Sequence, residues 1–259
     1  MFLQNVNKIR ICEVLGIPVY LNFSTLCLLF FFLGMTNSLL LDVACAAMLL
    51  VSIVCHELGH ALMARRFGYR TRDITLSFIG GCASLEGIPH KAWQEFLTAI
   101  AGPAVSFMVA FLGFFLAPLT PFAFLGALLE ITAIINFSLG AFNLLPGFPM
   151  DGGRIFRSFL RAFTTRLRAT FWAMMVGRVA AWLLVLGPTI GIHHIWIIPV
   201  GGNFFLRLFI AWMIWQEGRR EYQMAERESC RMGRWDFSAR VSPPPYGGEE
   251  DETEIRRGR

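Results

Sequence analysis

Two histidines and a glutamate are spaced for metal chemistry in the segment His56-Glu57-Leu58-Gly59-His60. On a helix, residues at positions i and i+4 lie on the same face, so two imidazoles at this spacing can bind one metal ion. The pattern is typical of a zinc site in which the glutamate beside the first histidine acts as general base. The sequence therefore predicts zinc ligands at His56 and His60 and a catalytic base at Glu57.

The motif lies inside a long apolar run, which strengthens this prediction. Ionisable side chains within a membrane-spanning helix are costly, and they usually serve a function. The alternative explanation is a buried polar network that holds neighbouring helices together. Because two histidines and a glutamate occur together at a ligand spacing, we favour the metal site.

A catalytic zinc site takes three protein ligands, so a third must come from elsewhere in the chain. The candidates are the other histidines and two carboxylates: His90, His193, His194, Glu130 and Asp151. Asp151 is the best of them because it lies in residues 143–153, where two prolines and three glycines stop a helix from continuing. Irregular backbone at membrane depth is tolerated where it is buried or lines a water-filled cavity. The alternative is that Asp151 merely begins a helix over residues 154–163.

The composition excludes an ordinary soluble domain. Hydrophobic residues make up 55 % of the 259 residues and charged residues 16 %, and the mean hydropathy is +0.55. Soluble domains have about 45–50 % apolar and about 25 % charged residues. The net charge of +5 comes from basic residues placed between apolar runs, which is the pattern of cytoplasmic loops. We therefore expect the lipid bilayer, and no nucleic acid, as a partner.

Six runs have the length of about 20 apolar residues that a helix needs to cross a bilayer. They cover residues 17–40, 41–63, 96–117, 122–145, 169–187 and 192–215. The predicted fold class is an all-α polytopic membrane protein with six transmembrane helices.

Basic residues occur in every second connection between these runs. They precede the first run and occur in the stretches 65–91 and 154–168 and just after the sixth run, whereas residues 37–42, 118–121 and 188–191 have none. Cytoplasmic loops are enriched in lysine and arginine. The pattern predicts a multi-pass protein of the membrane, expected to be a bacterial cell membrane, with both termini in the cytoplasm.

One connection has the pattern of a small membrane-associated β-hairpin over residues 74–86. Apolar and polar residues alternate over residues 74–78, Gly80-Gly81 provides a turn, and residues 82–85 return. After residue 216 the composition changes to mixed charge, and three prolines and an acidic run follow near the end. We therefore expect a six-span domain at residues 1–216 and a cytoplasmic tail at 217–259 that is disordered at its end.

Four motifs in this order resemble those of the site-2 protease family of intramembrane zinc metalloproteases. They are the segment 56–60, Phe78-Ile79-Gly80-Gly81, Gly102-Pro103 and residues 143–153. The resemblance covers about residues 10–216. The chain differs from larger members of that family in having no recognisable PDZ insert and no CBS-type tail.

The resemblance implies an enzyme that hydrolyses a peptide bond within or near the transmembrane segment of a membrane-anchored substrate, in regulated intramembrane proteolysis. It implies Zn²⁺ held by His56, His60 and Asp151, with Glu57 as base and Asn143 near the scissile carbonyl. It also implies that the hairpin edge binds an unwound substrate, through Ile74, Leu76, Phe78, Gly80 and Gly81. A single-span substrate protein and a regulatory membrane protein are the expected partners.

Two other functions are considered for the same residues. One is a catalytically idle membrane scaffold of the same fold, and the presence of every expected catalytic residue argues against it. The other is a metal transporter, although no internal repeat of the kind common in transporters is found. Two further intramembrane charges, Glu130 and Arg178, either pair with each other or line an access route, and we favour the structural ion pair.

Overall fold

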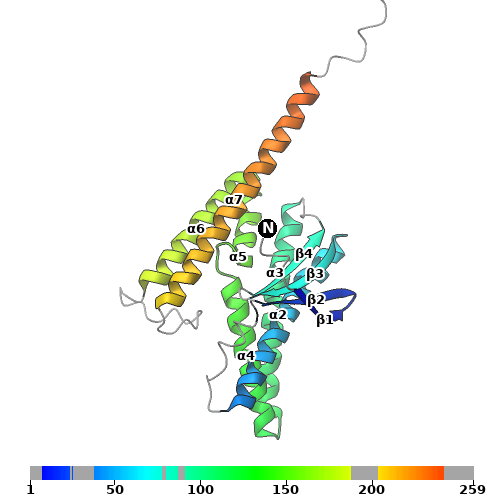
Figure 1. The fold of residues 1–259 in the computed structure, drawn as a ribbon, viewed down its shortest axis with the longest axis vertical. Helices are drawn as coiled ribbons and strands as arrows, with labels where there is room; N and C mark the ends of the chain where they lie inside the picture. The colour runs from blue at the N-terminus through cyan, green and yellow to red at the C-terminus, as the bar shows by residue number, and fades with distance from the viewer. Residues whose placement is uncertain are drawn as a thin grey trace, which may run out of the picture.

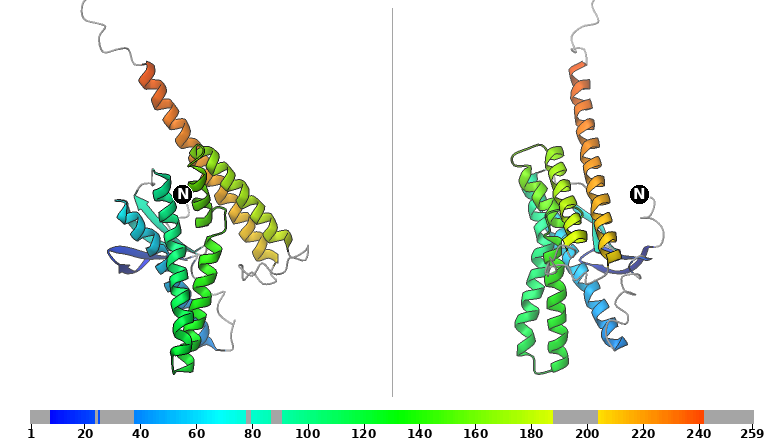
Figure 2. Two further views of the ribbon diagram at one scale, coloured as in Figure 1. Left: turned by 180° about the vertical axis from the view of Figure 1, so that it is seen from behind. Right: turned by 90° about the vertical axis from the view of Figure 1, so that its left-hand side faces the viewer.

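A computed structural model of the protein describes residues 8–23, 25, 38–77, 80–86, 91–187 and 204–241. Its helices form two groups (Figures 1 and 2). Helices α2 (Leu39–Arg66), α3 (Ala92–Leu116) and α4 (Ala123–Asn143) pack on one another, and α6 (Arg166–Leu186) packs along α7 (Phe204–Val241). The short helix α5 (Asp151–Leu160) contacts both α3 and α6 and so joins the two groups.

Four helices in the described part of the chain are long and apolar enough to cross a membrane. They are α2, α3 with its short 3₁₀ extension η1 (Ala117–Leu119), α4, and α6. Each coincides with one of the predicted spans. Large apolar side chains remain exposed along them, such as Phe111 on α3 and Ile134 on α4. Exposed apolar surface of this extent is expected where lipid, rather than water, surrounds the helices.

The predicted start of the first membrane span is wrong, because residues 17–22 form a strand and not a helix. Strand β2 (Ile17–Asn22) pairs antiparallel with β1 (Lys8–Val14). The two turn residues between them, Leu15 and Gly16, have φ of 53° and 82°, as a tight two-residue hairpin requires. Of the rest of the predicted first span, residues 24 and 26–37 lie outside the described residues, as do residues 192–203 of the sixth.

The expected hairpin forms, but as half of a larger sheet, so the all-α prediction is incomplete. Strands β3 (Arg70–Ser77) and β4 (Gly80–Glu86) pair antiparallel, with Ser77 opposite Gly80. Strand β2 then pairs parallel with β3 to give the order β1-β2-β3-β4. Strand β3 is therefore interior, and β4 is an edge strand.

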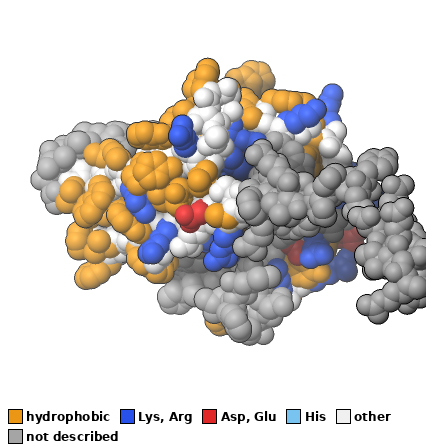
Figure 3. Space-filling view, turned by 90° about the horizontal axis from the view of Figure 1, so that it is seen from above, with side chains coloured by type: hydrophobic (Ala, Val, Ile, Leu, Met, Phe, Trp, Pro, Cys, Tyr) orange, Lys and Arg blue, Asp and Glu red, His pale blue; other side chains and the backbone are white. Residues whose placement is uncertain are grey.

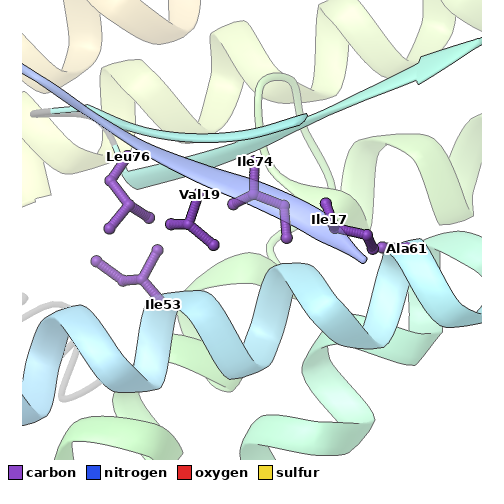
Figure 4. Close-up of a cluster of buried hydrophobic side chains, with 6 residues drawn as sticks. All are labelled: Ile17, Val19, Ile53, Ala61, Ile74 and Leu76. Atoms are coloured by element: carbon purple, nitrogen blue, oxygen red, sulfur yellow. The ribbon is translucent and has the colours of Figure 1, made fainter. Parts of the chain in front are cut away.

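An apolar core fixes this sheet on α2 (Figure 4). Its buried members come from β2, β3 and α2: Ile17, Val19, Ile74, Leu76, Ile53 and Ala61. Alternate residues of a strand point to one face, which explains why Ile17 and Val19 of β2, and Ile74 and Leu76 of β3, are buried here. Because Ile53 and Ala61 flank the His56–His60 motif on α2, this core places the sheet beside the predicted metal site.

The predicted boundary at residue 216 does not interrupt the structure. Helix α7 runs through it without a break, from Phe204 to Val241. Beyond the boundary α7 still packs on α6, where Gly218 faces Met174 and Glu228 pairs with Arg166 at 3.1 Å. The start of the expected tail is thus part of the helical core, and its expected disordered end lies outside the described residues.

Candidate metal centre

Three buried side chains converge on one point between α2 and α5. The Nε2 atoms of His56 and His60 are 3.2 Å apart, and each lies 3.0 Å from Oδ2 of Asp151. Among the histidine, cysteine, aspartate and glutamate side chains of the described residues, these three lie close enough together to hold a metal ion. Of the candidates for the third ligand, the structure brings Asp151 to the two histidines, while Glu130 is exposed on α4.

The backbone explains how Asp151 reaches the two histidines. Helix α4 ends at Asn143, and residues 144–150 form a bend before Asp151 begins α5. A Cβ at Gly152 would overlap the carbonyl oxygens of Leu144 and Leu145. Only glycine at position 152 therefore lets α5 begin this close to the bend. In this position the Asp151 carboxylate contacts the two histidines of α2.

Helix α3 orients both imidazoles through its polar groups. His60 Nδ1 donates a hydrogen bond to the Thr98 carbonyl oxygen at 2.7 Å, and His56 Nδ1 lies 2.9 Å from Ser106 Oγ. Both Nε2 atoms are thereby turned toward Asp151. Metal-binding histidines usually have such a partner on the second ring nitrogen. Thr98 and Ser106 were not predicted from the sequence, although with Gly102 they follow a four-residue spacing on one face of an apolar helix.

Gly102 of α3 allows both imidazoles to pack closely against this helix. A Cβ at this position would overlap Nε2 of His60 and lie 2.8 Å from Nε2 of His56. Only glycine at this position therefore lets both imidazole nitrogens lie this close to the backbone of α3. Two nitrogen ligands and one oxygen ligand suit zinc with a fourth position left for water. The residues present therefore fit a catalytic zinc ion.

Glu57 lies between α2 and strand β4. Glu57 is 9 % exposed, and Gly81 of β4 packs so closely that a Cβ there would overlap the Glu57 Cγ. Glu57 follows His56 directly on α2, so its backbone is adjacent to that of a candidate ligand. An acidic group beside a metal and beneath a strand edge can exchange a proton with a water or a peptide at that edge.

The comparison with known proteins agrees with this geometry. The family model for Peptidase family M50 matches residues 44–124 and 119–187, a region that includes all three candidate ligands. The chain belongs to Peptidase family M50.

Several known proteins are similar to most of this chain. A relative from Synechocystis sp. is 35 % identical over 81 % of this chain and 58 % of its own length. A zinc metalloprotease from Methanocaldococcus jannaschii is 34 % identical over 69 % of this chain and 53 % of its own length. The chain thus spans about half the length of the curated relatives it matches. The solved site-2 protease from Methanocaldococcus jannaschii superposes with a TM-score of 0.62 at 28 % identity, covering 83 % of this chain and 95 % of that one.

The remaining predicted site residues of this M50 chain belong to the sheet or to the end of α4. Ile74 and Leu76 are buried in the core between the sheet and α2, whereas Gly80 and Gly81 lie on the edge strand β4. Phe78 lies outside the described residues. Asn143 is half-buried at the end of α4, where its amide nitrogen donates to the Leu139 carbonyl oxygen at 2.9 Å. In the structure this amide nitrogen therefore has a partner within its own helix.

The predicted ion pair between Glu130 and Arg178 is wrong. The Arg178 guanidinium instead stacks on the Trp215 ring of α7, 4.4 Å from its centroid. Glu130 is exposed, and among the described residues no salt bridge joins the two. A cation over an aromatic face is an alternative way to place an arginine among apolar helices.

Proposed function

We propose that this chain is an intramembrane zinc metalloprotease, which hydrolyses a peptide bond within or near the transmembrane segment of a membrane-anchored protein. The observation that supports this best is the cluster of His56, His60 and Asp151, with Glu57 beside it, on a helix long enough to cross a membrane. The names of two relatives, a zinc metalloprotease and a site-2 protease, support the same activity. Regulated intramembrane proteolysis, with a regulatory membrane protein, is the biological setting we propose.

Different side chains would bind the metal ion, transfer the proton and stabilise the oxyanion. His56, His60 and Asp151 would hold the zinc ion, which when bound supplies a Lewis acid that polarises a peptide carbonyl and acidifies water. Glu57 accepts the proton of the attacking water and then delivers it to the leaving amine. Thr98 and Ser106 keep the two imidazoles in place while this happens. We also propose that the Asn143 amide turns toward the developing oxyanion when substrate binds.

We further propose that the substrate binds as an extended strand along β4. A transmembrane helix hides its peptide groups in hydrogen bonds to residue i−4, so it must unwind before it can be cut. Strand β3 is paired on both sides, whereas β4 is an edge strand and passes directly over Glu57 through Gly81. An extended segment added to this edge would bring its peptide bonds beside the proposed base.

Two single-span reporter proteins in liposomes test the activity and the unwinding separately. One has a Gly-Pro pair in its apolar segment, and its matched control has Ala-Ala at the same positions. We expect cleavage within or next to the apolar segment, faster for the Gly-Pro reporter because its helix opens more easily. Mass spectrometry of the products locates the cut. Equal cleavage of both reporters would contradict the unwinding step, and cleavage of neither would contradict the proposed activity.

The proposed orientation places the ends of α2 and α3 nearest the metal centre toward the cytoplasm. Seen from the end at which α7 leaves the body, lysine and arginine side chains gather among hydrophobic ones (Figure 3). His60 is five residues from Arg65, so about 7–8 Å along the helix separates the ligand from the basic end of α2. This supports a site just below the cytoplasmic face, within reach of water.

Reporter fusions test this orientation. Fusions after Asp42 and Leu119 should report an extracytoplasmic position, and fusions after Lys91 and Arg161 a cytoplasmic one, because arginines concentrate in the cytoplasmic connections. A phosphatase reporter that is active outside the cytoplasm and a fluorescent one that is active inside give opposite signals at each site. A cytoplasmic signal at Leu119 would contradict the orientation.

A further inference from the structure

A buried group of charged side chains joins three helices beside the metal centre. Arg157 of α5 and Arg161, the residue that caps the end of α5, both donate to the carboxylate of Glu95 on α3. Arg157 Nε lies 2.8 Å from Oε1, and Arg161 Nη1 lies 2.7 Å from Oε2. Arg157 Nη1 also donates to Glu221 of α7 at 2.9 Å. Arg157 is 4 % exposed and Glu95 is 5 % exposed. A buried charge needs such partners, and a planar guanidinium can satisfy several at once.

Glu221 remains charged in this group. Burial alone would raise the pKa of its carboxyl group, but the positive charges of Arg157 and Arg154 outweigh that effect and hold the pKa below its usual value. The α7 helix therefore presents an ionised carboxylate to Arg157 at neutral pH. Arg157 thus has a negative partner on the helix to each side of α5.

Two of the residues that Arg157 contacts are close in the chain to residues of the metal centre. Its guanidinium lies over the ring of Phe148, 4.9 Å from the centroid, and Phe148 is buried in the bend three residues before Asp151. Glu95, its partner on α3, is three residues before Thr98, whose carbonyl oxygen accepts the hydrogen bond of His60. One side chain thus joins the bend that carries the carboxylate ligand to the helix that orients a histidine ligand.

We propose that Arg157 is a positioning residue of the metal centre, which holds the Asp151 carboxylate in register with the nitrogens of His56 and His60. Its own guanidinium touches neither the zinc ion nor the substrate. It acts by fixing α5 and the Phe148 bend against α3, so that the three ligand atoms meet without further adjustment. This inference rests on the proposed function only in requiring that the cluster binds zinc.

The test compares Arg157→Gln with Arg166→Gln as a matched control. Both variants remove an arginine that pairs with a glutamate of α7, but the hydrogen-bonding partner of Arg166 is Glu228 and not Glu95. Zinc affinity is measured on the purified full chain in detergent by competition with a chelator, and the visible spectrum of the cobalt-substituted protein reports ligand geometry. Thermal unfolding of the metal-free protein measures stability separately.

We expect Arg157→Gln to bind zinc about 10–100-fold more weakly, the scale found for residues that support metal ligands, and to change the cobalt spectrum. Arg166→Gln should bind zinc as the unchanged chain does, even if it unfolds at a lower temperature. Unchanged zinc affinity in folded Arg157→Gln would overturn the proposal. An absence of zinc binding by the unchanged chain would instead overturn the proposed function.

If Arg157→Gln does not fold, the variant Arg157→Lys tests the positioning role instead. Lysine keeps the charge but not the planar fork, so it cannot serve Glu95, Glu221 and Phe148 together. Weaker zinc binding by folded Arg157→Lys would support the proposal, and wild-type affinity would overturn it. If neither variant folds while Arg166→Gln does, Arg157 is a residue of general stability and the positioning role is overturned.

Discussion

Replacement of Glu57 by glutamine is expected to lower cleavage by about 10²–10⁴-fold while zinc stays bound. Glutamine keeps the size of the side chain between α2 and Gly81, so the packing against β4 is preserved. It cannot accept the proton of the attacking water, and the ligands His56, His60 and Asp151 are unchanged. Single-turnover cleavage of a reconstituted single-span reporter, with zinc content measured on the same sample, shows both effects.

The matched control for this prediction is Glu217→Gln on α7. Glu217 pairs with Arg220 on the same helix and is not one of the candidate metal ligands, so the same chemical change there should leave cleavage unaltered. Wild-type cleavage by Glu57→Gln would show that Glu57 is not the base. A reporter that stays bound but uncut by the wild-type protein would favour the scaffold of the same fold.

Replacement of Gly102 by alanine is expected to remove most zinc binding. The added Cβ would overlap Nε2 of His60 and lie 2.8 Å from Nε2 of His56, so the imidazoles must turn away or α3 must move from α2. Gly59 of α2 already packs on the Ala101 carbonyl oxygen, and this close packing limits such a movement. Zinc affinity should fall by at least the roughly 10–100-fold seen when the support of a metal ligand is disturbed.

Gly126→Ala in α4 is the control for the alanine substitution. A Cβ there would lie 3.3 Å from its nearest neighbours, which are not metal ligands, so zinc affinity should be unaffected. Isothermal titration of both metal-free variants with zinc measures the difference. If Gly102→Ala bound zinc as tightly as the unchanged chain, the ligand geometry described for α2 and α3 would be incorrect.

The sequence predicts those parts of the site that depend on local patterns. The four-residue spacing places His56 and His60 on one helix face, and the prolines and glycines before Asp151 indicate a break in the helix. Both follow from backbone geometry that is set within a few residues. The four apolar helices are predicted for the same reason, since length and composition alone define them.

The errors arise where distant partners decide the structure. Residues 17–22 are as apolar as a membrane span, but they form a strand because Val19 and Leu21 find parallel partners at Ile74 and Leu76. Likewise, Arg157 and Glu95 are 62 positions apart, and nothing in either local sequence indicates that they meet. Arg178 is a third case, since its ring partner Trp215 belongs to another helix.

The most direct test of the proposed activity measures zinc and cleavage on one preparation of the purified wild-type chain, before and after chelation. We predict about one zinc per chain, loss of reporter cleavage when that zinc is removed, and recovery when one equivalent is restored. A variant without His56, His60 and Asp151, each replaced by alanine, should neither retain zinc nor recover cleavage. Reporter cleavage by the zinc-free protein, or zinc retained by the triple variant, would contradict the assignment of these residues as a catalytic metal centre.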